Sequence, residues 1–361
     1  MNNLRNKILI GIAGCFFAVL VLMVWIMPSK EYSASERRPL KQMPELSIES
    51  ILTGRFMSNF EDYTLDQFPL RDKFRTLKAI TSLKSDNNDI YVIGNVINKT
   101  DYPLNENKLA YASGRFLNVY NSYLKDSGNN IYLSIIPDKN FFYAEDNGYL
   151  AIDYDKLVNT IKNNSDYMSY IDIFPYLEGD DYYMTDTHWK QENISDIAEV
   201  LLKGMGNDVS YTYETVEMEE DFYGVYYGQA ALPLDPDKLS YLTNDMIKQF
   251  KVFDHQNNKE IPVYNEEKMT SDDPYELFTG GPISLATIEN PACENGKHLI
   301  IFRDSFGSSL APLLAQGYSK TTLIDIRYIM PQMLGNLVDF ENADILFIYS
   351  SSVLNNSELL K

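Results

Sequence analysis

The chain has 361 residues, of which 45% are hydrophobic and 23% charged, so it can bury the core of one large domain or two small ones. Its formal net charge is -20, which disfavours nucleic acid or an anionic membrane surface as a partner, because both select patches of Lys and Arg. Cys15 lies in an apolar run and Cys293, the second cysteine, lies far outside it, so no disulfide framework is possible.

An uncharged run extends from Ile8 to Met27, and its 20 residues are about one bilayer thick as a helix. The basic N-terminus before it predicts that the bulk of the chain lies outside the cytoplasm. The run is longer than the apolar core of most cleaved signals, and Ser33-Ala34-Ser35 is a poor, distant cleavage site. We therefore expect residues 1–28 to be a cytoplasmic tip and a retained single-pass anchor in the cell membrane. A cleaved signal peptide is the alternative.

Residues 29–85 are expected to form a stalk with amphipathic helices. Three prolines between positions 28 and 44 favour an extended first part. Aromatic residues then recur with the spacing of one helix face, at Phe56, Phe60 and Tyr63. A second amphipathic helix is expected from Arg71 to Leu83, after Pro69 has interrupted the first. A turn cluster at 85–89 closes the segment.

Residues 86–361 alternate between short apolar runs and amphipathic stretches, which indicates an α/β domain with a mostly parallel sheet. Strands are expected at 90–94, 130–137, 171–173, 298–302, 322–326 and 343–349. Helices are expected at 109–124, 157–161, 191–205, 306–316 and 332–337. The stretch 207–295 is rich in Tyr, Asp, Glu and Pro, which predicts an irregular insertion of β structure and loop, as in a lid or a polymer-binding surface.

The stretch Asp186-Thr187-His188-Trp189 carries the first chemical signal. An Asp-x-His sequence allows the carboxylate of Asp186 to lie against Nδ1 of His188, which fixes the tautomer and leaves Nε2 free as a base. The alternative is structural: Asp186 can instead cap the helix expected at 191–205.

The second signal is Ser305, which follows the strand 298–302 and precedes the helix 306–316. Chemistry in parallel sheets lies outside the carboxyl ends of the strands, and an N–H at a helix N-terminus can stabilise an oxyanion. Ser305 is thus a candidate nucleophile, with His188 as its base and Asp186 orienting the imidazole. A purely structural helix N-cap is the alternative for Ser305.

Asp186-Thr187-His188-Trp189, taken together with Asp304-Ser305-Phe306, resembles the DHHW proteins and the related periplasmic alginate O-acetyltransferases. The likeness extends to segments that resemble further family elements: residues 60–71, Pro137-Asp138-Lys139 and Asp325-Ile326-Arg327-Tyr328. The chain departs from the pattern at Thr187, where the family name implies His, and at Arg303, where related enzymes often have Gly.

This resemblance implies an SGNH-hydrolase-like (flavodoxin-like) fold with helices on both faces of the sheet, in which the Asp/His pair comes first and the Ser last. It implies a Ser305–His188–Asp186 triad in an extracytoplasmic O-acetyltransferase acting on an exopolysaccharide or a cell-wall glycan. A multi-pass membrane acyltransferase is the implied acetyl donor. A carbohydrate esterase of the same fold and a non-catalytic polysaccharide-binding protein are the alternatives.

Two further residues are expected near the polysaccharide acceptor, Lys139 and Trp189. A solvated turn is the competing role for Lys139, and packing against a helix is the competing role for Trp189. No cofactor or metal is expected, since the chain has no phosphate-binding or dinucleotide-binding fingerprint and the other histidines lack zinc-ligand spacing.

Overall fold

The computed structural model describes residues 2–33, 35–81, 89–125 and 127–361. It divides into two compact units. The first comprises residues 1–88 and 227–234, and the second comprises 89–226 and 235–361. Each unit is described by itself below.

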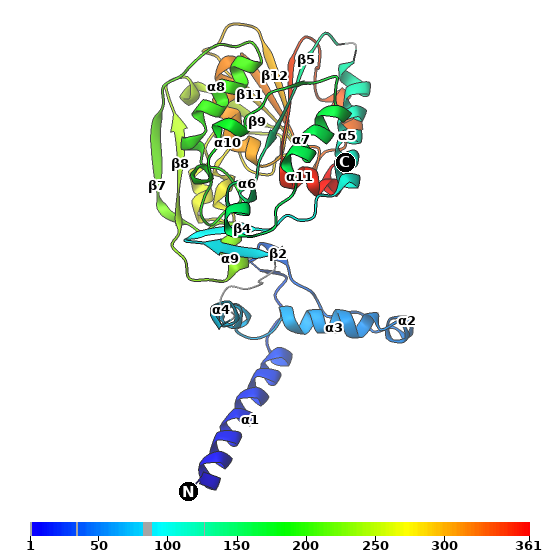
Figure 1. The fold of residues 1–361 in the computed structure, drawn as a ribbon, viewed down its shortest axis with the longest axis vertical. Coiled ribbons are helices and arrows are strands. Elements are labelled where there is room, and N and C mark those ends of the chain that lie inside the picture. The colour runs from blue at the N-terminus through cyan, green and yellow to red at the C-terminus, as the bar shows by residue number, and fades with distance from the viewer. Residues whose placement is uncertain (1, 34, 82–88, 126) are drawn as a thin grey trace. The chain divides into compact units, whose positions relative to one another are not determined.

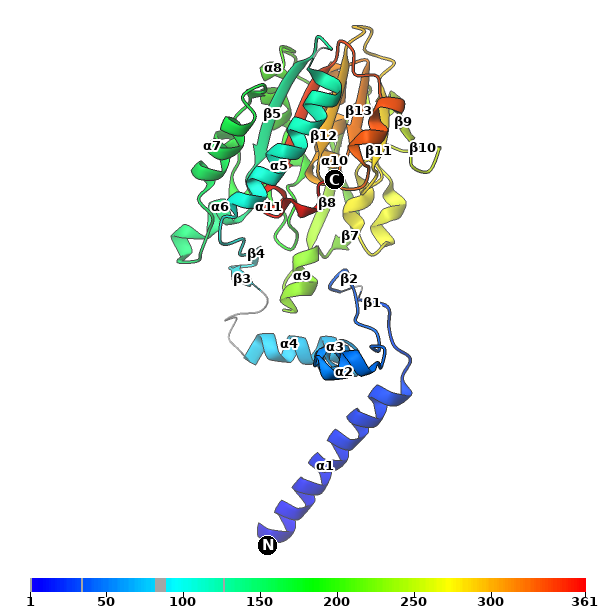
Figure 2. The same cartoon turned by 90° about the vertical axis from the view of Figure 1, so that its right-hand side faces the viewer.

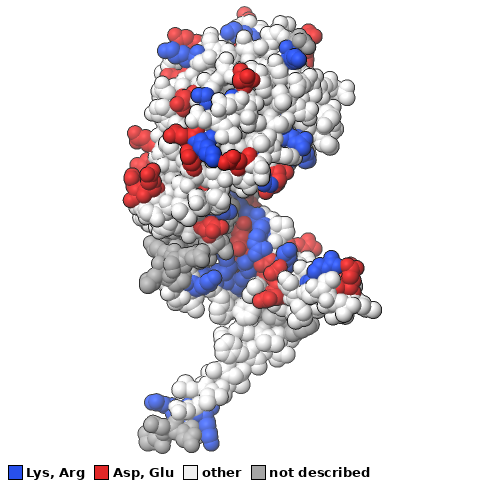
Figure 3. All heavy atoms as spheres, turned by 45° about the vertical axis from the view of Figure 1, so that its right-hand side comes forward, with Lys and Arg blue, Asp and Glu red and all other residues white. Residues whose placement is uncertain are grey.

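The first unit begins with helix α1 (Asn2–Ile26). Its segment Leu4–Val24 is long and apolar enough to cross a membrane, and a signal sequence would have the same character. Figure 3 shows it as an uncharged rod with basic side chains at its N-terminal end. The apolar N-terminal helix expected from the sequence is therefore present.

Short elements follow in the same unit: a two-stranded ribbon and three helices. The strands are β1 (Tyr32–Ser33) and β2 (Arg38–Pro39), and the helices are α2 (Ile48–Leu52), α3 (Arg55–Asp66) and α4 (Arg71–Thr81). The aromatic stripe of α3 forms as expected, because the rings of Phe56, Phe60 and Tyr63 contact one another along one face. The expected end of the second helix at Leu83 and the turn cluster at 85–89, except Asp89, lie outside the described residues.

An eight-stranded sheet forms the centre of the second unit, in the order β10-β9-β11-β13-β12-β14-β5-β6 (Figure 1). Its parallel strands are β5 (Asn130–Ile136), β6 (Ser169–Tyr170), β12 (His298–Arg303), β13 (Lys320–Ile324) and β14 (Asp344–Ser350). They are neighbours in the order β13-β12-β14-β5-β6. If β12 is counted as the first strand, β13 as the second, β14 as the third, β5 as the fourth and β6 as the fifth, this order is 2-1-3-4-5, which is the flavodoxin-like order. In this chain the fourth and fifth strands come first in the sequence, so the order is circularly permuted. The expected mostly parallel, flavodoxin-like sheet is confirmed.

Helices cover both faces of this sheet. On one face lie α8 (Ser195–Gly204) and α10 (Phe306–Leu314), and on the other lie α5 (Glu106–Val119), α7 (Tyr154–Asn164) and α11 (Ser351–Asn355) (Figures 1 and 2). The middle of strand β12 is apolar because both of its sides are buried: Leu299 and Ile301 belong to the first core, and Ile300 and Phe302 to the second.

The stretch 207–295 is more regular than expected. It contributes three antiparallel strands to the central sheet, β9 (Lys251–Asp254), β10 (Lys259–Ile261) and β11 (Leu285–Glu289). A separate ribbon pairs β7 (Glu214–Phe222) with β8 (Asp237–Thr243), and along the chain α9 (Val225–Ala230) comes after β7 and before β8. Strand β7 is mostly exposed on both faces and β11 is almost wholly buried. Neither strand therefore shows the apolar alternation that identifies a half-buried strand.

Several other expected elements are present with different bounds. Strand β3 (Ile90–Ile93) pairs with β4 (Val96–Lys99) in a ribbon outside the central sheet, and a short helix α6 is added at Asn140–Tyr143. The strand expected at 171–173 is β6, two residues earlier. The helix expected at 191–205 opens with a 3₁₀ turn, and the one expected at 332–337 is a 3₁₀ segment, Pro331–Asn336. These shifts are of the size usual for element ends.

Candidate active site

Ser305 lies where β12 ends and α10 begins, as expected. Its side chain makes no capping hydrogen bond to the helix, so it is not a side-chain N-cap. Instead, Ser305 Oγ lies 2.7 Å from Nε2 of His188, within hydrogen-bond distance. The Ser305 side chain is half-buried and His188 is 8% exposed, so the pair is reachable from solvent.

Asp186 lies on the other side of the imidazole. Its Oδ1 is 2.6 Å from His188 Nδ1, and the His188 amide donates to the same oxygen at 3.1 Å. The Val225 amide donates to Oδ2 at 2.8 Å. Because a buried carboxylate faces Nδ1, that nitrogen carries the proton, and Nε2 is left to accept the Ser305 hydroxyl proton. The structure thus brings together all three residues of the expected triad, and Asp186 does not cap the helix at 191–205.

The His188 ring is held between aromatic side chains. Tyr275 stacks on it with ring centroids 3.9 Å apart and planes 7° apart, and Phe306 lies at 4.9 Å. The Tyr275 hydroxyl donates to Ser309 Oγ at 2.8 Å, which fixes the stacked ring to α10. Tyr275 comes from the stretch 207–295, and nothing in the sequence pattern singled it out.

Trp189 is placed differently from expectation. Its indole is fully buried, its Nε1 donates to Ser309 Oγ at 2.8 Å, and its ring meets Phe306 edge to face. A side chain with no exposed surface cannot contact a polysaccharide, so the expected acceptor role of Trp189 is corrected to packing beneath the site. Trp189 also fixes the end of the loop that carries His188.

Lys139 is also buried rather than exposed at an acceptor surface. Its Nζ donates to the carbonyls of Tyr183 at 2.9 Å and Met184 at 3.3 Å, and lies 5.0 Å from the centre of the Tyr226 ring. Burial lowers the pKa of Lys139 to about 7, against the opposing attraction of Asp186 and other carboxylates. Lys139 therefore supports the loop before Asp186, which corrects both the expected acceptor role and its alternative, a solvated turn.

Two buried acids hold this arrangement, and sequence reasoning did not assign either a role at the site. Asp237 accepts hydrogen bonds from the amides of Met184 and Thr185 at 2.8 and 2.7 Å. Asp304 accepts from the Ser350 amide at 2.7 Å and thereby joins the ends of the neighbouring strands β12 and β14. Asp304 directly precedes Ser305, and Asp237 ends the short acidic stretch 235–237. The sequence does not reveal these hydrogen-bond partners, because they lie far away along the chain.

The Ser305 amide stands at the N-terminus of α10, where the helix dipole favours negative charge. Among the described residues it donates to no acceptor, whereas the next amide, that of Phe306, donates to Asp304 Oδ1 at 3.1 Å. The Ser305 N–H is therefore available to a developing oxyanion.

Within the described residues, no group of three or more His, Cys, Asp or Glu is arranged to hold a metal ion. The other two histidines contact threonine hydroxyls on the sheet, His255 at Thr287 and His298 at Thr322.

The sequence matches no protein-family model and no curated protein. Among solved structures, it is similar to a DHHW family protein from Eubacterium siraeum DSM 15702, with a TM-score of 0.60 and 20% identity over 77% of this chain and 97% of that one. It is also similar to Bacillus cereus PatB1 with a sulfonyl adduct, with a TM-score of 0.59 and 16% identity over 73% of this chain and 95% of that one. The chain shares their fold. At these identities the likeness concerns the fold alone, and it confirms the SGNH-hydrolase-like architecture.

Arg303 is the second departure from the family pattern noted in the sequence, and the structure shows how the chain accommodates it. The side chain is 1% exposed, forms an ion pair with Asp325 at 3.5 Å and donates to the Ile283 carbonyl at 3.2 Å. Burial lowers its pKa. A Cβ at Gly307 would lie 2.6 Å from Arg303 Cβ, so the arginine fits because residue 307 has no side chain.

Proposed function

We propose that this protein is an extracytoplasmic O-acetyltransferase that modifies an exopolysaccharide or a cell-wall glycan through an acyl-enzyme on Ser305. The observation that carries the proposal is the chain of two hydrogen bonds from Ser305 Oγ to His188 Nε2, and from His188 Nδ1 to Asp186 Oδ1, at 2.7 and 2.6 Å. A serine hydroxyl becomes an effective nucleophile when an oriented imidazole takes its proton.

In the first half-reaction Ser305 Oγ attacks the carbonyl carbon of an acetyl donor while its proton passes to His188 Nε2. The carbonyl oxygen becomes an oxyanion facing the Ser305 N–H. When the tetrahedral intermediate collapses, the bond from the carbonyl carbon to the donor breaks, and His188 returns the proton to the leaving group. The product is an acetyl ester on Ser305. Asp186 stabilises the imidazolium throughout.

In the second half-reaction a sugar hydroxyl gives its proton to His188 and attacks the acetyl ester. The bond to Ser305 Oγ breaks, and the serine recovers its proton from His188. The acetyl group leaves on the sugar oxygen. Water in place of the sugar would release acetate, so the same residues would then act as an esterase.

The similarity to solved structures supports this chemistry. A sulfonyl adduct, as seen in the Bacillus cereus protein, is the product expected when a sulfonyl reagent meets an activated nucleophile. The shared fold gives Ser305 a position at the carboxyl edge of the sheet, where such a nucleophile is expected. The buried Asp186 and His188 are hydrogen-bonded to each other, as a working triad requires.

The apolar helix α1 supports a place at the membrane. We propose that it remains as a single-pass anchor in the cell membrane, with the rest of the chain outside the cytoplasm. An anchored catalytic unit suits a multi-pass membrane acyltransferase as the acetyl donor, since donor and acceptor enzymes would share one membrane.

The test is acetyl release from p-nitrophenyl acetate by the purified chain, with and without glycan oligosaccharides, followed by mass spectrometry of the oligosaccharides. Acetylated oligosaccharide that depends on Ser305 supports the transferase. Acetate without any acetylated sugar would indicate the esterase. Binding of oligosaccharide with no Ser305-dependent turnover would indicate the non-catalytic alternative.

A further inference from the structure

The segment that follows α1 is amphipathic and does not share the acidity of the rest of the chain. Residues 29–88 hold 10 Lys and Arg against 9 Asp and Glu, so their net charge is +1, whereas residues 89–361 hold 19 against 42, a net charge of -23. The repulsion from an anionic bilayer that the whole-chain charge suggests therefore does not apply to this segment.

Helices α3 and α4 and the turn that joins them leave large apolar side chains uncovered. The exposed fraction exceeds one third for each of these residues: Met57 65%, Leu65 62%, Leu70 53%, Phe74 36%, Leu77 55% and Ile80 52%. Phe74, Leu77 and Ile80 recur at every third position, which places them on one face of α4. Water-exposed protein surfaces seldom carry so many large apolar side chains close together, so this surface is suited to contact with an apolar environment.

Hydrogen bonds tie the end of α3 to the chain just beyond α1. The Lys30 amide donates to Gln67 Oε1 at 2.9 Å, and Gln67 Nε2 donates back to the Lys30 carbonyl at 2.8 Å. Lys30 is four residues past the last residue of α1, a reach of at most about 14 Å of extended chain. If α1 spans the membrane, the C-terminal end of α3 must lie at the membrane surface.

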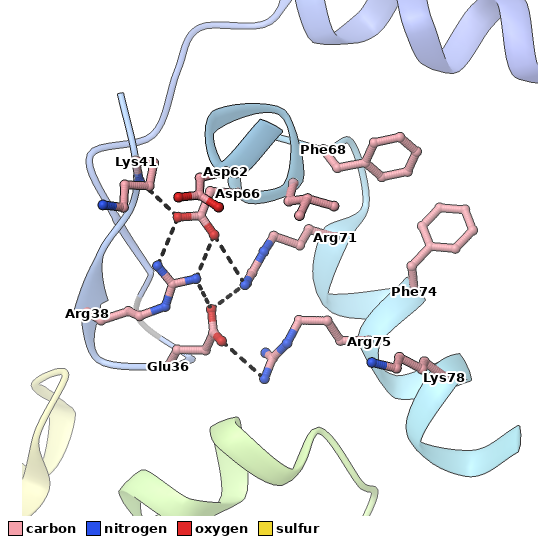
Figure 4. A pocket seen from close by; sticks show the side chains of 11 residues that line it. Glu36, Arg38, Lys41, Asp62, Asp66, Phe68, Arg71, Phe74, Arg75 and Lys78 are labelled. Carbon is pink, nitrogen blue, oxygen red and sulfur yellow. Dashed lines mark hydrogen bonds and ion pairs between the residues drawn. The ribbon is translucent and has the colours of Figure 1, made fainter. Parts of the chain in front are cut away.

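A cavity of about 680 Å³ lies beside these helices and combines cationic walls with an apolar rim. Figure 4 shows its basic side chains, which are Arg38 from β2, Lys41 just after that strand, and Arg71, Arg75 and Lys78 from α4. Figure 3 shows Lys and Arg gathered on this part of the chain. The apolar rim includes Leu65, Phe68 and Phe74, and the last two rings meet edge to face at 5.5 Å.

Internal ion pairs neutralise part of this charge and leave an excess. Asp66 binds Arg38 at 2.6 Å, and Glu36 binds Arg71 at 2.5 Å and Arg75 at 3.3 Å. With Asp62 there are three carboxylates against five cations, so the lining carries a net charge of +2. Within the described part of the chain, the ammonium groups of Lys41 and Lys78 make no ion pair, so both can receive an anion.

We infer that α3 and α4 lie in the interface of an anionic phospholipid bilayer, with their apolar side chains among the acyl chains and a lipid phosphodiester headgroup in the cavity lined by Lys41 and Lys78. A cationic wall beside an apolar rim matches an amphiphile whose phosphate and acyl chains are joined. The inference rests on the proposed membrane anchor, and does not depend on the acyl-transfer chemistry of Ser305.

The test uses the full chain in vesicles of phosphatidylglycerol or of phosphatidylcholine, with one nitroxide label per variant. Cys15 and Cys293 are replaced by Ser, and labels are placed on Leu65→Cys or Leu77→Cys, with Asp72→Cys on the opposite side of α4 as the matched control. Faster relaxation of the nitroxide by oxygen indicates that the label lies in lipid. Faster relaxation by a water-soluble nickel complex indicates that the label is exposed to water. In a further variant only Cys293 is replaced, and the label on the native Cys15 reports whether α1 spans the membrane.

We expect oxygen to dominate at positions 15, 65 and 77, and nickel to dominate at 72. A water-exposed label at 65 and 77 with a lipid-exposed Cys15 would overturn the inference and leave the anchor intact. A label at Cys15 outside the lipid would overturn both. Labels at 65 and 77 shielded from both reagents would indicate a protein partner on this face and also overturn it. Hydrolysis of p-nitrophenyl acetate in the same vesicles tests Ser305 separately.

The headgroup site is tested with the paired substitution Lys41→Gln and Lys78→Gln, which leaves the arginine–carboxylate pairs untouched. Selectivity for spin-labelled phosphatidylglycerol over phosphatidylcholine should fall by about five-fold for each lysine removed. Unchanged selectivity would overturn the headgroup assignment. Loss of the wild-type selectivity on addition of soluble glycerol phosphate at millimolar concentration would show a site for free phosphate esters instead, and would overturn the lipid assignment.

Discussion

Ser305 Oγ and His188 Nε2 lie 2.7 Å apart, although 117 residues of chain separate them. The permuted sheet order explains this meeting. Ser305 follows β12, which lies between β13 and β14 in the sheet, while His188 is carried by the long loop after β6, the strand at one edge of the sheet. That loop returns across the carboxyl ends of the strands and is fixed there by Trp189, Lys139 and Asp237.

Replacement of Ser305 by Ala should lower kcat for acetyl release by roughly 10⁴-fold or more, because it removes the hydroxyl that hydrogen-bonds to His188 Nε2. The matched control is Ser308→Ala in the same helix. Ser308 Oγ is buried and, among the described residues, has no hydrogen-bond partner, so this substitution should leave the rate within about two-fold of wild type. Equal losses in the two variants would point to a structural effect on α10.

Tyr275 should act by holding the imidazole in place. Tyr275→Phe keeps the stacked ring and loses only the hydrogen bond to Ser309, so kcat should change little. Tyr275→Ala removes the stacked face and should lower kcat by about 10- to 100-fold, because a small displacement of a catalytic base is costly. Initial rates and far-UV circular dichroism of both variants check this, and a phenylalanine variant as slow as the alanine variant would assign the role to the hydroxyl.

Lys139 should make the free energy of unfolding depend on pH. Its folded pKa of about 7 is lower than the ordinary value of 10.5, so between pH 7 and 10 the unfolded chain binds the proton that the folded chain has lost. Stability therefore rises with pH in that window, by at most on the order of 5 kcal/mol, and the rise is absent below pH 7. Lys139→Met should abolish it, while Lys248→Met on the surface should not. Denaturant unfolding in detergent across pH 7–10 measures this, and identical slopes in wild type and Lys139→Met would contradict it.

Burial of Glu192 should make stability depend on pH in the opposite direction, at pH values below that window. Its pKa is raised to about 7 from 4.5, so the unfolded chain releases the proton first and stability falls as pH rises from about 4.5 to 7. Glu192→Gln should flatten this fall without changing the behaviour above pH 7. Unfolding midpoints measured at pH 5 and pH 7 in both proteins provide the comparison.

Gly307 and Arg303 should behave as a coupled pair. Gly307→Ala brings a Cβ to 2.6 Å from Arg303 Cβ, which should shift the start of α10 and cost about 1–3 kcal/mol of stability. Arg303→Gly relieves that clash, so the double variant should lose about 1 kcal/mol less than the sum of the single losses. Gly114→Ala, which meets open space in α5, is the control and should be neutral or stabilising. Strict additivity at positions 303 and 307 would contradict the packing described.

The sequence was most informative where residue type and local pattern agree. Ser305 stands shortly after the apolar run 299–302 and directly before a helix. The Asp-x-His spacing allows the side chains of Asp186 and His188 to contact each other locally. Both are local relationships, so they could be predicted from the chain alone. The α/β class followed from the alternation of apolar runs and amphipathic stretches, for the same reason.

What could not be predicted depends on contacts between distant segments. Tyr275 lies in a stretch without apolar alternation, and its position over His188 is set by the antiparallel strands that this stretch adds to the sheet. Lys139 and Trp189 were expected at a ligand surface because each stands in a segment that resembles a family element, but tertiary packing buries both. Burial of a charged or aromatic side chain has no local signal in a single sequence.

The most direct measurement is mass spectrometry of the protein after brief reaction with p-nitrophenyl acetate and an acid quench. A proteolytic peptide containing Ser305 should carry one acetyl ester at that residue in the wild type, and its formation should be strongly slowed in His188→Ala. If acetate release continues at the wild-type rate in Ser305→Ala, with no acetyl group on the Ser305 peptide of the wild type, the acyl-enzyme at Ser305 is wrong.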